Sequence, residues 1–321
     1  MRVLVIGGTL FVGRHIVETL LAHGHSVAVL NRGQTPDALA PEVVRLRADR
    51  HQHDQVRAAV DGHRFDAVVD CIGYEADDVR ATIELFRGQI WRYVFISSTS
   101  VYRPGTVFPI DEWAPLQEGS RWRYAQQKVE IEASLAEAGR AFGFPWVSLR
   151  PAYIYGPYNS NPMAEFALFA RVEAGRPVLV PGDGSFVIHH THGRDLAEAT
   201  LVALTNDRAI GNCYNVMGAY AQTGDRLVRA AAAAAGREAE IVHVPVRNNE
   251  EARRFFFFQP RPTQIYSIER ARRELGWQPA FDIDAGLRDS YRWYRETGYA
   301  QRHTFDFSEE DKVLAELAGK S

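Results

Sequence analysis

The sequence predicts an α/β fold, with a doubly wound parallel sheet in its N-terminal part and a smaller lobe at its C-terminal end. Short apolar runs alternate with segments of helical periodicity over the first 150 residues, which is typical of strand–helix–strand units. A glycine-rich turn follows the first apolar run at Gly7, and the composition changes at Pro151. Together these observations indicate a Rossmann-type domain at 1–150, and a lobe at 151–321 interleaved with the last Rossmann elements.

The elements of the first part are predicted from the spacing of their apolar residues. Short continuous runs of Val, Ile and Leu are typical of parallel strands buried on both faces. Apolar residues at intervals of three and four indicate helices, and Gly24 is suited to end the first of them. Strands are therefore expected at 3–6, 26–30, 43–46, 66–70, 91–96 and 146–150, with helices at 11–23 and 121–140 and another ending at Phe86.

Beyond Pro151 the pattern is less regular. The stretch 151–184 is rich in Pro, Gly, Tyr and Asn, which predicts long functional loops rather than packed layers. Regular structure is expected to return as a helix at 195–204, a strand at 213–216 and a helix at 225–235. The aromatic run Phe255–Phe258 is interpreted as a buried segment, with an apolar subunit contact as the alternative.

Composition limits the function classes. The formal net charge of -3 does not predict a surface for nucleic acid or for an anionic membrane. The apolar run after Met1 is too short for a secretory signal or a membrane span, so we expect a cytoplasmic protein that acts on a small molecule. Cys71 and Cys213 lie far apart, which indicates free thiols. A homodimer is compatible with this composition.

The glycine-rich turn has the residues that a phosphate-binding site needs. It reads Gly7-Gly8-Thr9-Leu10-Phe11-Val12-Gly13 and lies between the first strand and the first helix. Glycines there permit a tight turn and a close approach of a pyrophosphate, and the helix N-terminus offers N–H groups and a positive dipole end. We therefore expect Gly7, Thr9, Leu10, Phe11, Val12 and Gly13 to contact a dinucleotide. The alternative is an ordinary strand-to-helix turn.

The end of the second strand indicates which dinucleotide binds. An acidic residue there would bind the hydroxyls of the adenosine ribose and reject a 2′-phosphate, but this chain has Asn31-Arg32. A guanidinium can bind a phosphate through two hydrogen bonds, so NADP is admissible beside NAD. Arg32 as a solvated loop residue is the alternative.

A tyrosine–lysine pair carries the predicted chemistry. Tyr124 and Lys128 are four residues apart, which places both side chains on one face of a helix. A free phenol is too weak an acid to transfer protons at neutral pH, and a neighbouring ammonium lowers its pKa towards that range. The pair follows the hydroxyl-rich run Ser97–Ser100 at the end of the fifth strand, which favours a catalytic role over an exposed helix face.

With these motifs the chain resembles the extended short-chain dehydrogenase/reductase family, the NAD-dependent epimerase/dehydratases. Gly7 and Gly13 match the outer glycines of its G-x-x-G-x-x-G turn, and Leu10 stands where the middle glycine would be. The variant GGTxFxG, followed by NRG, resembles an atypical subgroup that includes chloroplast RNA-binding relatives. Leu149–Pro157 and Pro181–Gly184 resemble later family segments, so the likeness extends over about 1–299.

The resemblance implies further site residues. Alignment on Val101-Tyr102 puts the substrate-binding hydroxyl at Ser98, with Thr99 as the alternative. Asp49 matches the aspartate that binds the adenine amino group. The resemblance also implies cofactor contacts at Arg50, Cys71 and Tyr153, in addition to Asn31, Arg32, Tyr124 and Lys128.

The same alignment narrows the reaction. Related dehydratases and decarboxylases carry a glutamate at the second position after the catalytic hydroxyl residue, but here these two positions are Thr99 and Ser100. The leading hypothesis is therefore an NAD(P)-dependent nucleotide-sugar epimerase that forms a transient ketone. An NADPH-dependent ketoreductase of a sugar nucleotide or small carbonyl compound, and a non-enzymatic nucleotide- or RNA-binding relative, are the alternatives.

Two other groups of residues are candidates for binding. His189, His190 and His192 are interpreted as structural or substrate-contacting, with no metal, because neighbouring strand residues point to opposite faces. Candidate ligands for a substrate diphosphate are Arg171, Arg253, Arg254 and Arg261, with solvated arginines as the alternative.

Overall fold

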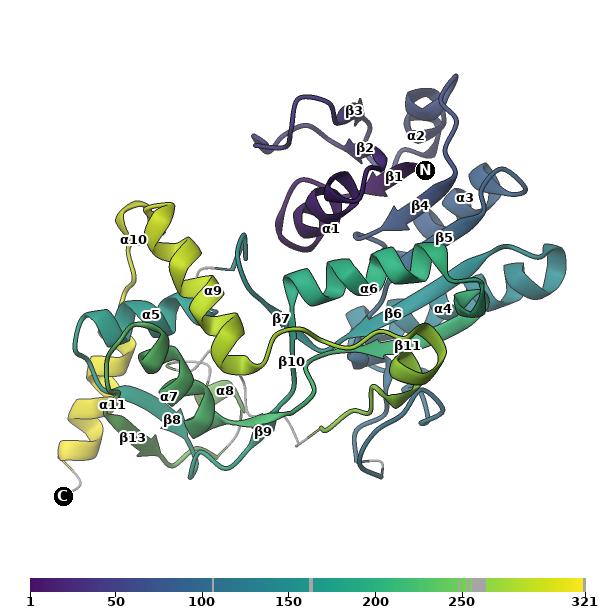
Figure 1. The fold of residues 1–321 in the computed structure, drawn as a ribbon. Coiled ribbons are helices and arrows are strands. Elements are labelled where there is room, and N and C mark those ends of the chain that lie inside the picture. The colour runs from purple at the N-terminus through teal and green to yellow at the C-terminus, as the bar shows by residue number, and fades with distance from the viewer. Residues whose placement is uncertain (106, 162–163, 248, 253–254, 256–263, 320–321) are drawn as a thin grey trace. The chain divides into compact units, whose positions relative to one another are not determined.

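The structure is a computed structural model of the chain, and it describes residues 1–105, 107–161, 164–247, 249–252, 255 and 264–319. The described residues divide into two units, both of which the chain enters more than once (Figure 1). The first unit consists of Met1–Ile154, Gly193–Met217 and Tyr266–Pro279. The second consists of Tyr155–His192, Gly218–Ile265 and Ala280–Ser321.

A seven-stranded parallel sheet forms the first unit, with strand order β11-β6-β5-β4-β1-β2-β3. The direction in which strands are added reverses between β1 and β4, and a doubly wound sheet has its ligand crevice at such a point. The strands are β1 (Arg2–Ile6), β2 (Ser26–Asn31), β3 (Val44–Arg47), β4 (Ala67–Asp70), β5 (Arg92–Ile96), β6 (Trp146–Pro151) and β11 (Asn212–Val216).

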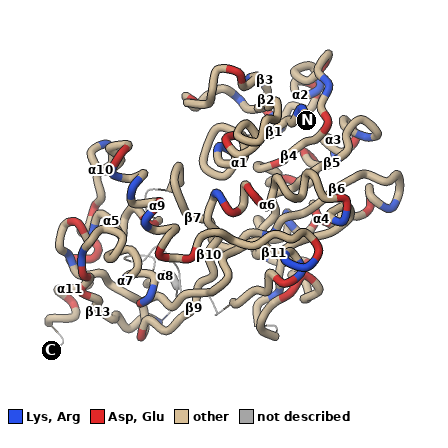
Figure 2. Tube along the Cα trace, viewed as in Figure 1, with Lys and Arg blue, Asp and Glu red and all other residues tan. Residues whose placement is uncertain are grey.

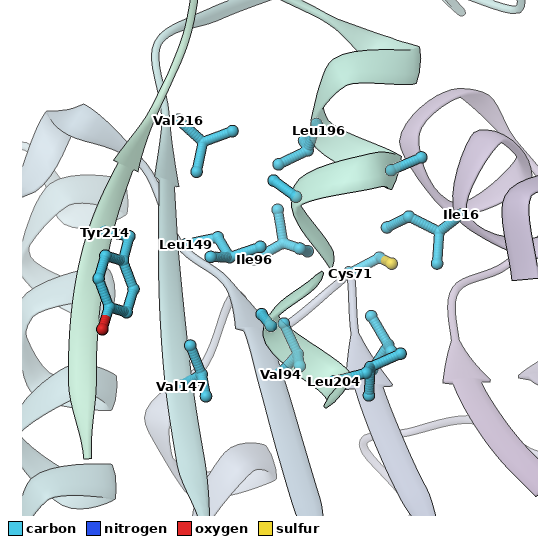
Figure 3. Close-up of a cluster of buried hydrophobic side chains, with 14 of the residues drawn as sticks. Ile16, Cys71, Val94, Ile96, Val147, Leu149, Leu196, Leu204, Tyr214 and Val216 are labelled. Atoms are coloured by element: carbon cyan, nitrogen blue, oxygen red, sulfur yellow. The ribbon is translucent and has the colours of Figure 1, made fainter. Parts of the chain in front are cut away.

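Helices cover both faces of this sheet, which explains why its strands are apolar throughout. On one face, α1 (Phe11–Ala22) and α6 (Gly193–Thr205) bury their apolar sides. Figure 3 shows Leu196 and Leu204 of α6 facing side chains of the sheet. The other face is covered by α2 (His53–Val60), α3 (Ala76–Phe86) and α4 (Arg123–Phe142). The predicted Rossmann-type α/β fold is confirmed.

The second unit contains two small strand pairs and a group of helices. β8 (Val178–Pro181) pairs in parallel with β13 (Ile241–Val244), and β9 (Val187–Ile188) pairs antiparallel with β12 (Gln222–Thr223). The helices are α5 (Glu165–Glu173), α7 (Gly224–Ala234), α8 (Asn249–Ala252), α9 (Ile283–Glu296), α10 (Tyr299–Arg302) and α11 (Ser308–Ala318). The remaining short elements are β7 (Tyr153–Tyr155), β10 (His190–His192), the 3-10 turns η1 (Thr99–Val101) and η2 (Asp207–Ala209), and the π-helical turn η3 (Ala271–Leu275).

Aromatic packing and several ion pairs hold the helices of the second unit together. The Phe166 ring of α5 lies 5.9 Å from the Tyr294 ring of α9 and 4.6 Å from the ring of Tyr299. Arg171 of α5 donates a 2.8 Å hydrogen bond from Nε to the Glu310 carboxylate of α11, and both side chains are buried. The C-terminal helix is thus tied to the unit by a charge pair and not by apolar contacts alone.

Three expectations from the sequence need correction or limits. The prediction of loops at 151–184 was wrong, because β7, α5 and β8 lie there and Phe166 and Phe169 give α5 a buried face. Helix α2 was not predicted. Phe255 is buried, as expected, while Phe256–Phe258 lie outside the described residues.

Charge is evenly mixed over the molecule. Figure 2 shows Lys and Arg interleaved with Asp and Glu along both units. None of the helices in the described ranges is long and apolar enough to cross a membrane.

Candidate active site

The glycine-rich turn between β1 and α1 is shaped for close approach. Gly7 has a φ of +88°, a conformation that favours glycine. A Cβ on Gly13 would lie 2.8 Å from the Gly8 Cα and would overlap the Gly7 carbonyl oxygen. The turn therefore folds back on the first turn of α1 only because glycine occupies position 13. Such a tight loop with a helix N-terminus beneath it fits a dinucleotide pyrophosphate.

Leu10, which replaces the middle glycine of the family turn, is accommodated without strain. Its φ of -125° and ψ of 150° are ordinary extended values, and the side chain is 48% exposed. It caps α1 without making a side-chain hydrogen bond. The unusual backbone falls on the next residue, Phe11, whose φ is +39°. Thr9 and Val12 are half-buried beside it.

Asn31 ends β2 and organises the turn that follows it. Its Oδ1 accepts a 2.8 Å hydrogen bond from the Gly33 N–H, which closes the turn around Arg32. The Arg32 side chain is exposed. Arg32 is thus presented to solvent at the strand end where a Rossmann fold meets the adenosine ribose.

Asp49 and Arg50, which follow β3, have quite different surroundings. Asp49 is half-buried, and its Oδ1 accepts a hydrogen bond from the His51 N–H at 3.1 Å. The Arg50 guanidinium is only 8% exposed and donates two hydrogen bonds to Asp70, of 2.8 and 3.0 Å. The Arg50 side chain is bonded to Asp70, so only the main chain of Arg50 remains for the expected cofactor contact.

The Asp70 carboxylate ends β4 in complete burial. It also accepts a 2.8 Å hydrogen bond from the Tyr93 hydroxyl. Burial raises the pKa of Asp70, but the Arg50 charge and the hydrogen bonds outweigh it and hold that pKa below its ordinary value. Removing one partner of a buried ion pair of this kind costs several kcal/mol. Arg50 and Asp70 therefore fix the chain where β3 and β4 end.

Cys71 and Tyr153 both follow strands of the parallel sheet, at the carboxyl ends. Cys71 is buried directly after β4, and burial raises the pKa of its thiol. A thiol in this state is a small apolar wall and not a nucleophile. Tyr153 is half-buried in β7. The cofactor contacts expected of both residues stay predictions.

Tyr124 and Lys128 lie one turn apart on α4, as the spacing predicts. The Lys128 Nζ is 5.6 Å from the centre of the Tyr124 ring. It donates hydrogen bonds to the carbonyl oxygens of Gly73 at 3.0 Å and Ile96 at 2.8 Å. The chain ends of β4 and β5 therefore fix the ammonium beside the phenol.

Lys128 is almost completely buried, with 1% of its surface exposed. Burial lowers the pKa of its ammonium to about 8, while the Asp70 charge opposes that change. The rings of Phe95 and Tyr74 lie 4.5 and 5.2 Å from Nζ and give additional cation–π stabilisation. The pKa of Lys128 is thus brought close to neutral pH, and the ammonium lies where it can influence Tyr124.

Ser98 and Thr99 differ in access. The Ser98 side chain is half-buried, and its Oγ accepts a 3.1 Å hydrogen bond from the Ser100 N–H. Thr99 is buried at the start of η1. Ser98 caps this turn and keeps its hydroxyl hydrogen for another acceptor. Of the two, Ser98 is better suited to bind a substrate oxygen.

Two aromatic residues missed by sequence reasoning flank Tyr124. The Trp122 ring lies 5.5 Å from the Tyr124 ring, and the Tyr74 ring lies 6.3 Å from it. Both are well exposed, Trp122 at 43% and Tyr74 at 51%. Tyr74 follows β4, far from α4 in the sequence, so only the order of strands in the sheet brings it to the site. The position of Trp122, two residues before Tyr124, was the available signal.

The Leu149–Pro151 segment serves the fold. Arg150 is buried and donates to the Glu132 carboxylate from Nε at 3.0 Å and from Nη2 at 2.6 Å. Its Nη1 donates to the Tyr102 hydroxyl, which in turn donates to Asn215. This network joins α4 to three neighbouring parts of the unit. Arg150 therefore supports the site from behind.

The remaining candidates have limited roles. Arg171 is bound to Glu310, so it is not a free ligand for a diphosphate, and Arg253, Arg254 and Arg261 lie outside the described residues. The His189 Nε2 donates a 2.7 Å hydrogen bond to the Gly218 carbonyl oxygen, which is a structural role. In the part of the chain that the structure describes, no group of three or more His, Cys, Asp or Glu side chains is arranged to hold a metal ion.

Known proteins are similar to this chain in sequence and in fold. The pattern of the NAD dependent epimerase/dehydratase family matches residues 3–218. The chain is 33% identical to the chloroplast stem-loop binding protein of 41 kDa b of Arabidopsis thaliana, over 98% of this chain and 84% of that protein. It is 29% identical to 2'-dehydrokanamycin reductase of Streptomyces kanamyceticus, over 95% and 83%.

A solved structure of an epimerase has a fold similar to that of this chain. The UDP-glucose 4-epimerase of Thermus thermophilus, in complex with NAD, superposes with a TM-score of 0.74 at 27% identity, over 92% of this chain and 99% of that chain. The family expectation and the expectation of a nicotinamide-dependent enzyme are confirmed. The chain belongs to the NAD dependent epimerase/dehydratase family.

Proposed function

We propose that this chain is an NAD(P)-dependent enzyme that epimerises a nucleotide sugar through a transient ketone. The observation that carries the proposal is the position of the Lys128 ammonium, 5.6 Å from the ring of Tyr124 and bonded to the ends of β4 and β5. A phenol beside a fixed cation can take and return a proton at neutral pH. We assign dinucleotide binding to the first unit and substrate binding chiefly to the second.

The chain's own residues account for the proton transfers. Ser98 Oγ binds the reacting substrate oxygen, and the Tyr124 phenolate takes the hydroxyl proton as the carbonyl forms. The Lys128 charge favours the phenolate over the phenol. When bound, the nicotinamide supplies the acceptor and then the donor of hydride. Tyr124 returns its proton to the same oxygen after the ketone has presented its other face, which inverts the carbon.

The residues after Ser98 favour this reaction over elimination. A dehydratase or decarboxylase of this family would use a carboxylate there to remove a second proton. Thr99 and Ser100 are both buried hydroxyl residues, and Ser100 donates its main-chain N–H to Ser98. They offer no base for an elimination step.

Reduction of a ketone is the second candidate, and the end of β2 favours it. Arg32 replaces the acidic residue that would reject a 2′-phosphate. An epimerase recycles a bound cofactor and gains nothing from NADP selectivity, whereas a reductase uses the NADPH pool. The likeness to a protein named 2'-dehydrokanamycin reductase also supports this candidate.

The likeness to a stem-loop binding protein supports a third candidate, a non-enzymatic protein that binds nucleotides or RNA. Nucleic-acid binding depends on a concentrated positive surface. The formal net charge of -3 and the mixed charges in Figure 2 weigh against it, and the Tyr124–Lys128 pair would have no use in such a protein. We therefore place it last.

Incubation with UDP-sugars in D₂O tests the proposal. A ketone path returns the same hydrogen to carbon, so NMR should show an epimer with no deuterium at the inverted carbon and no net change in dinucleotide absorbance. No epimer, together with NADPH oxidation by a keto-sugar, would replace the epimerase by the reductase. If the protein binds neither NAD⁺ nor NADP⁺, both enzymatic candidates are wrong.

A further inference from the structure

A second arginine, Arg47, lies beside the end of β2. Asn31 and Arg47 are direct partners in the parallel register of β2 and β3. The Arg47 Nη1 donates a 2.6 Å hydrogen bond to the Asn31 Oδ1. The same oxygen accepts the Gly33 N–H at 2.8 Å, so one amide group orients both the turn and the guanidinium. Sequence reasoning could not find Arg47, since it lies 16 residues away.

The absence of a side chain at Gly33 leaves space for this guanidinium. Gly33 has a φ of +70°, and a Cβ there would lie 2.8 Å from the Arg47 Cζ. The guanidinium is therefore packed over the turn that contains Arg32. Both arginines are exposed. The strand end thus presents two cationic forks, one from the turn and one from β3.

Neither cation is paired with a carboxylate in the described part of the chain, since no ion pair there includes Arg32 or Arg47. The carboxylate that Arg47 influences is Asp37: the Arg45 hydrogen bond, with a smaller contribution from the Arg47 charge, lowers the pKa of Asp37. That carboxylate is bonded to Arg45 at 2.8 Å. Two exposed cations at one strand end favour an anion with several oxygens.

We propose that Arg47 and Arg32 together bind the 2′-phosphate of NADP, with Asn31 as the residue that positions Arg47. The inference rests on the proposed function, since it requires dinucleotide binding at the β1–α1 turn. The adenosine ribose of a bound dinucleotide lies at the end of the second strand in this fold. A guanidinium matches a phosphate through two parallel hydrogen bonds, and two guanidiniums from different strands would hold it from two sides.

Titration of the purified full chain with NAD⁺ and NADP⁺ by calorimetry tests the proposal without any assay of turnover. Arg47→Ala and Arg32→Ala should each weaken NADP⁺ binding about 10- to 100-fold, the range for a charge-assisted contact, and change NAD⁺ binding less than about twofold. Arg64→Ala is the matched control, because Arg64 is an exposed arginine before the amino end of β4, whereas the two candidates lie at carboxyl ends of strands. It should change neither affinity.

Asn31→Asp tests the strand end from the opposite side, because a carboxylate there both pairs with Arg47 and repels a 2′-phosphate. The Asn31 Nδ2 has no hydrogen-bond partner among the described residues, so this change removes no described contact while it draws Arg47 into a full ion pair. NADP⁺ binding should fall and NAD⁺ binding should hold or improve. Raised salt should weaken NADP⁺ binding more than NAD⁺ binding in the wild type, and this difference should be smaller in each arginine variant.

The outcomes separate the inference from the proposed function. If Arg47→Ala leaves NADP⁺ affinity unchanged, or weakens both dinucleotides equally, Arg47 does not bind the 2′-phosphate and the proposed function stands. If the wild type binds neither dinucleotide, the proposed function fails and the inference fails with it. Equal binding of NAD⁺ and NADP⁺ by every variant would also overturn the inference.

Discussion

The Lys128 ammonium and the Tyr124 ring lie 5.6 Å apart on one face of α4, and the ammonium is bonded to the main-chain carbonyls of Ile96, at the end of β5, and Gly73, in the loop after β4. This arrangement couples the proposed catalytic pair to the fold. A shift of β4 or β5 would move Gly73 or Ile96 and thereby the cation that tunes the phenol. The predictions below follow from this and from neighbouring contacts.

Lys128→Met should reduce turnover about 100-fold or more while the chain stays folded, because it removes the charge that favours the Tyr124 phenolate. The pKa of Lys128 is lowered by burial to about 8 from 10.5. Between these values the unfolded chain holds the proton and the folded chain does not, so Lys128 contributes a rise in stability with pH from 8 to 10.5, which the raised pKa values of the buried Cys71 and Cys213 thiols oppose. Urea unfolding at several pH values should show a more positive slope of stability against pH in the wild type and in the exposed control Lys312→Met than in Lys128→Met.

Gly13→Ala should abolish dinucleotide binding, since a Cβ there overlaps the Gly7 carbonyl and lies 2.8 Å from the Gly8 Cα. The turn must open to admit the methyl group, at a cost of about 1 to 3 kcal/mol. Calorimetric titration and thermal unfolding check both effects. Gly319→Ala, whose Cβ would meet its nearest neighbour at 3.5 Å, should behave as the wild type. Normal binding by Gly13→Ala would show that the turn is not the pyrophosphate site.

Glu165 predicts a second dependence on pH, in the second unit. Burial raises the pKa of Glu165 to about 7, although its carboxylate accepts hydrogen bonds from the Gly156 N–H and from Asn159. From pH 4.5 to 7 the folded chain holds a proton that the unfolded chain has lost, so Glu165 contributes a fall in stability of up to about 3 kcal/mol as pH rises, which the lowered pKa values of the buried His189 and His190 oppose. Glu165→Gln should remove this contribution and make the slope of stability against pH more positive than in the wild type, and the exposed control Glu137→Gln should keep the wild-type slope. An equal slope in all three would assign the change to other groups.

Tyr74 and Trp122 should contribute to substrate binding, and Tyr74 also contacts the Lys128 cation. Their exposed rings flank Tyr124 at 6.3 and 5.5 Å and can pack against a sugar ring. Tyr74→Ala and Trp122→Ala should each raise KM about 3- to 10-fold, and kcat should change little in Trp122→Ala but fall in Tyr74→Ala, which also loses the ring beside Lys128. Trp91→Ala, in an exposed position before β5, is the control. A fall in kcat with constant KM would instead place these rings in the transition state.

Much of the fold follows from the sequence because the strands of a parallel sheet are apolar runs. β1, β2, β4, β5 and β6 could be predicted to within a residue or two for this reason. Helix α2 was missed because only Val56 and Val60 are buried on it, which is too few for a periodic signal. Helix α5 was missed because its buried phenylalanines lie in a stretch dominated by turn-forming residues.

The site could be predicted where it is local in sequence and not where strand pairing assembles it. Tyr124 and Lys128 are one helical turn apart, so spacing alone places them together. Arg47 reaches Asn31 only through the β2–β3 register, and Tyr74 reaches Tyr124 only because β4 and β5 are neighbours. The Arg50–Asp70 pair was unforeseen for the same reason, and it reduces the role expected of Arg50 to its main chain.

The central claim is that Tyr124 transfers the proton, and Tyr124→Phe tests it most directly. One preparation of this variant should be titrated with NAD⁺ and NADP⁺ and then assayed with the substrate that the wild type converts. The account predicts dinucleotide affinity within about threefold of the wild type and turnover reduced at least about 100-fold. Turnover equal to the wild type would contradict the account and remove Tyr124 from the mechanism.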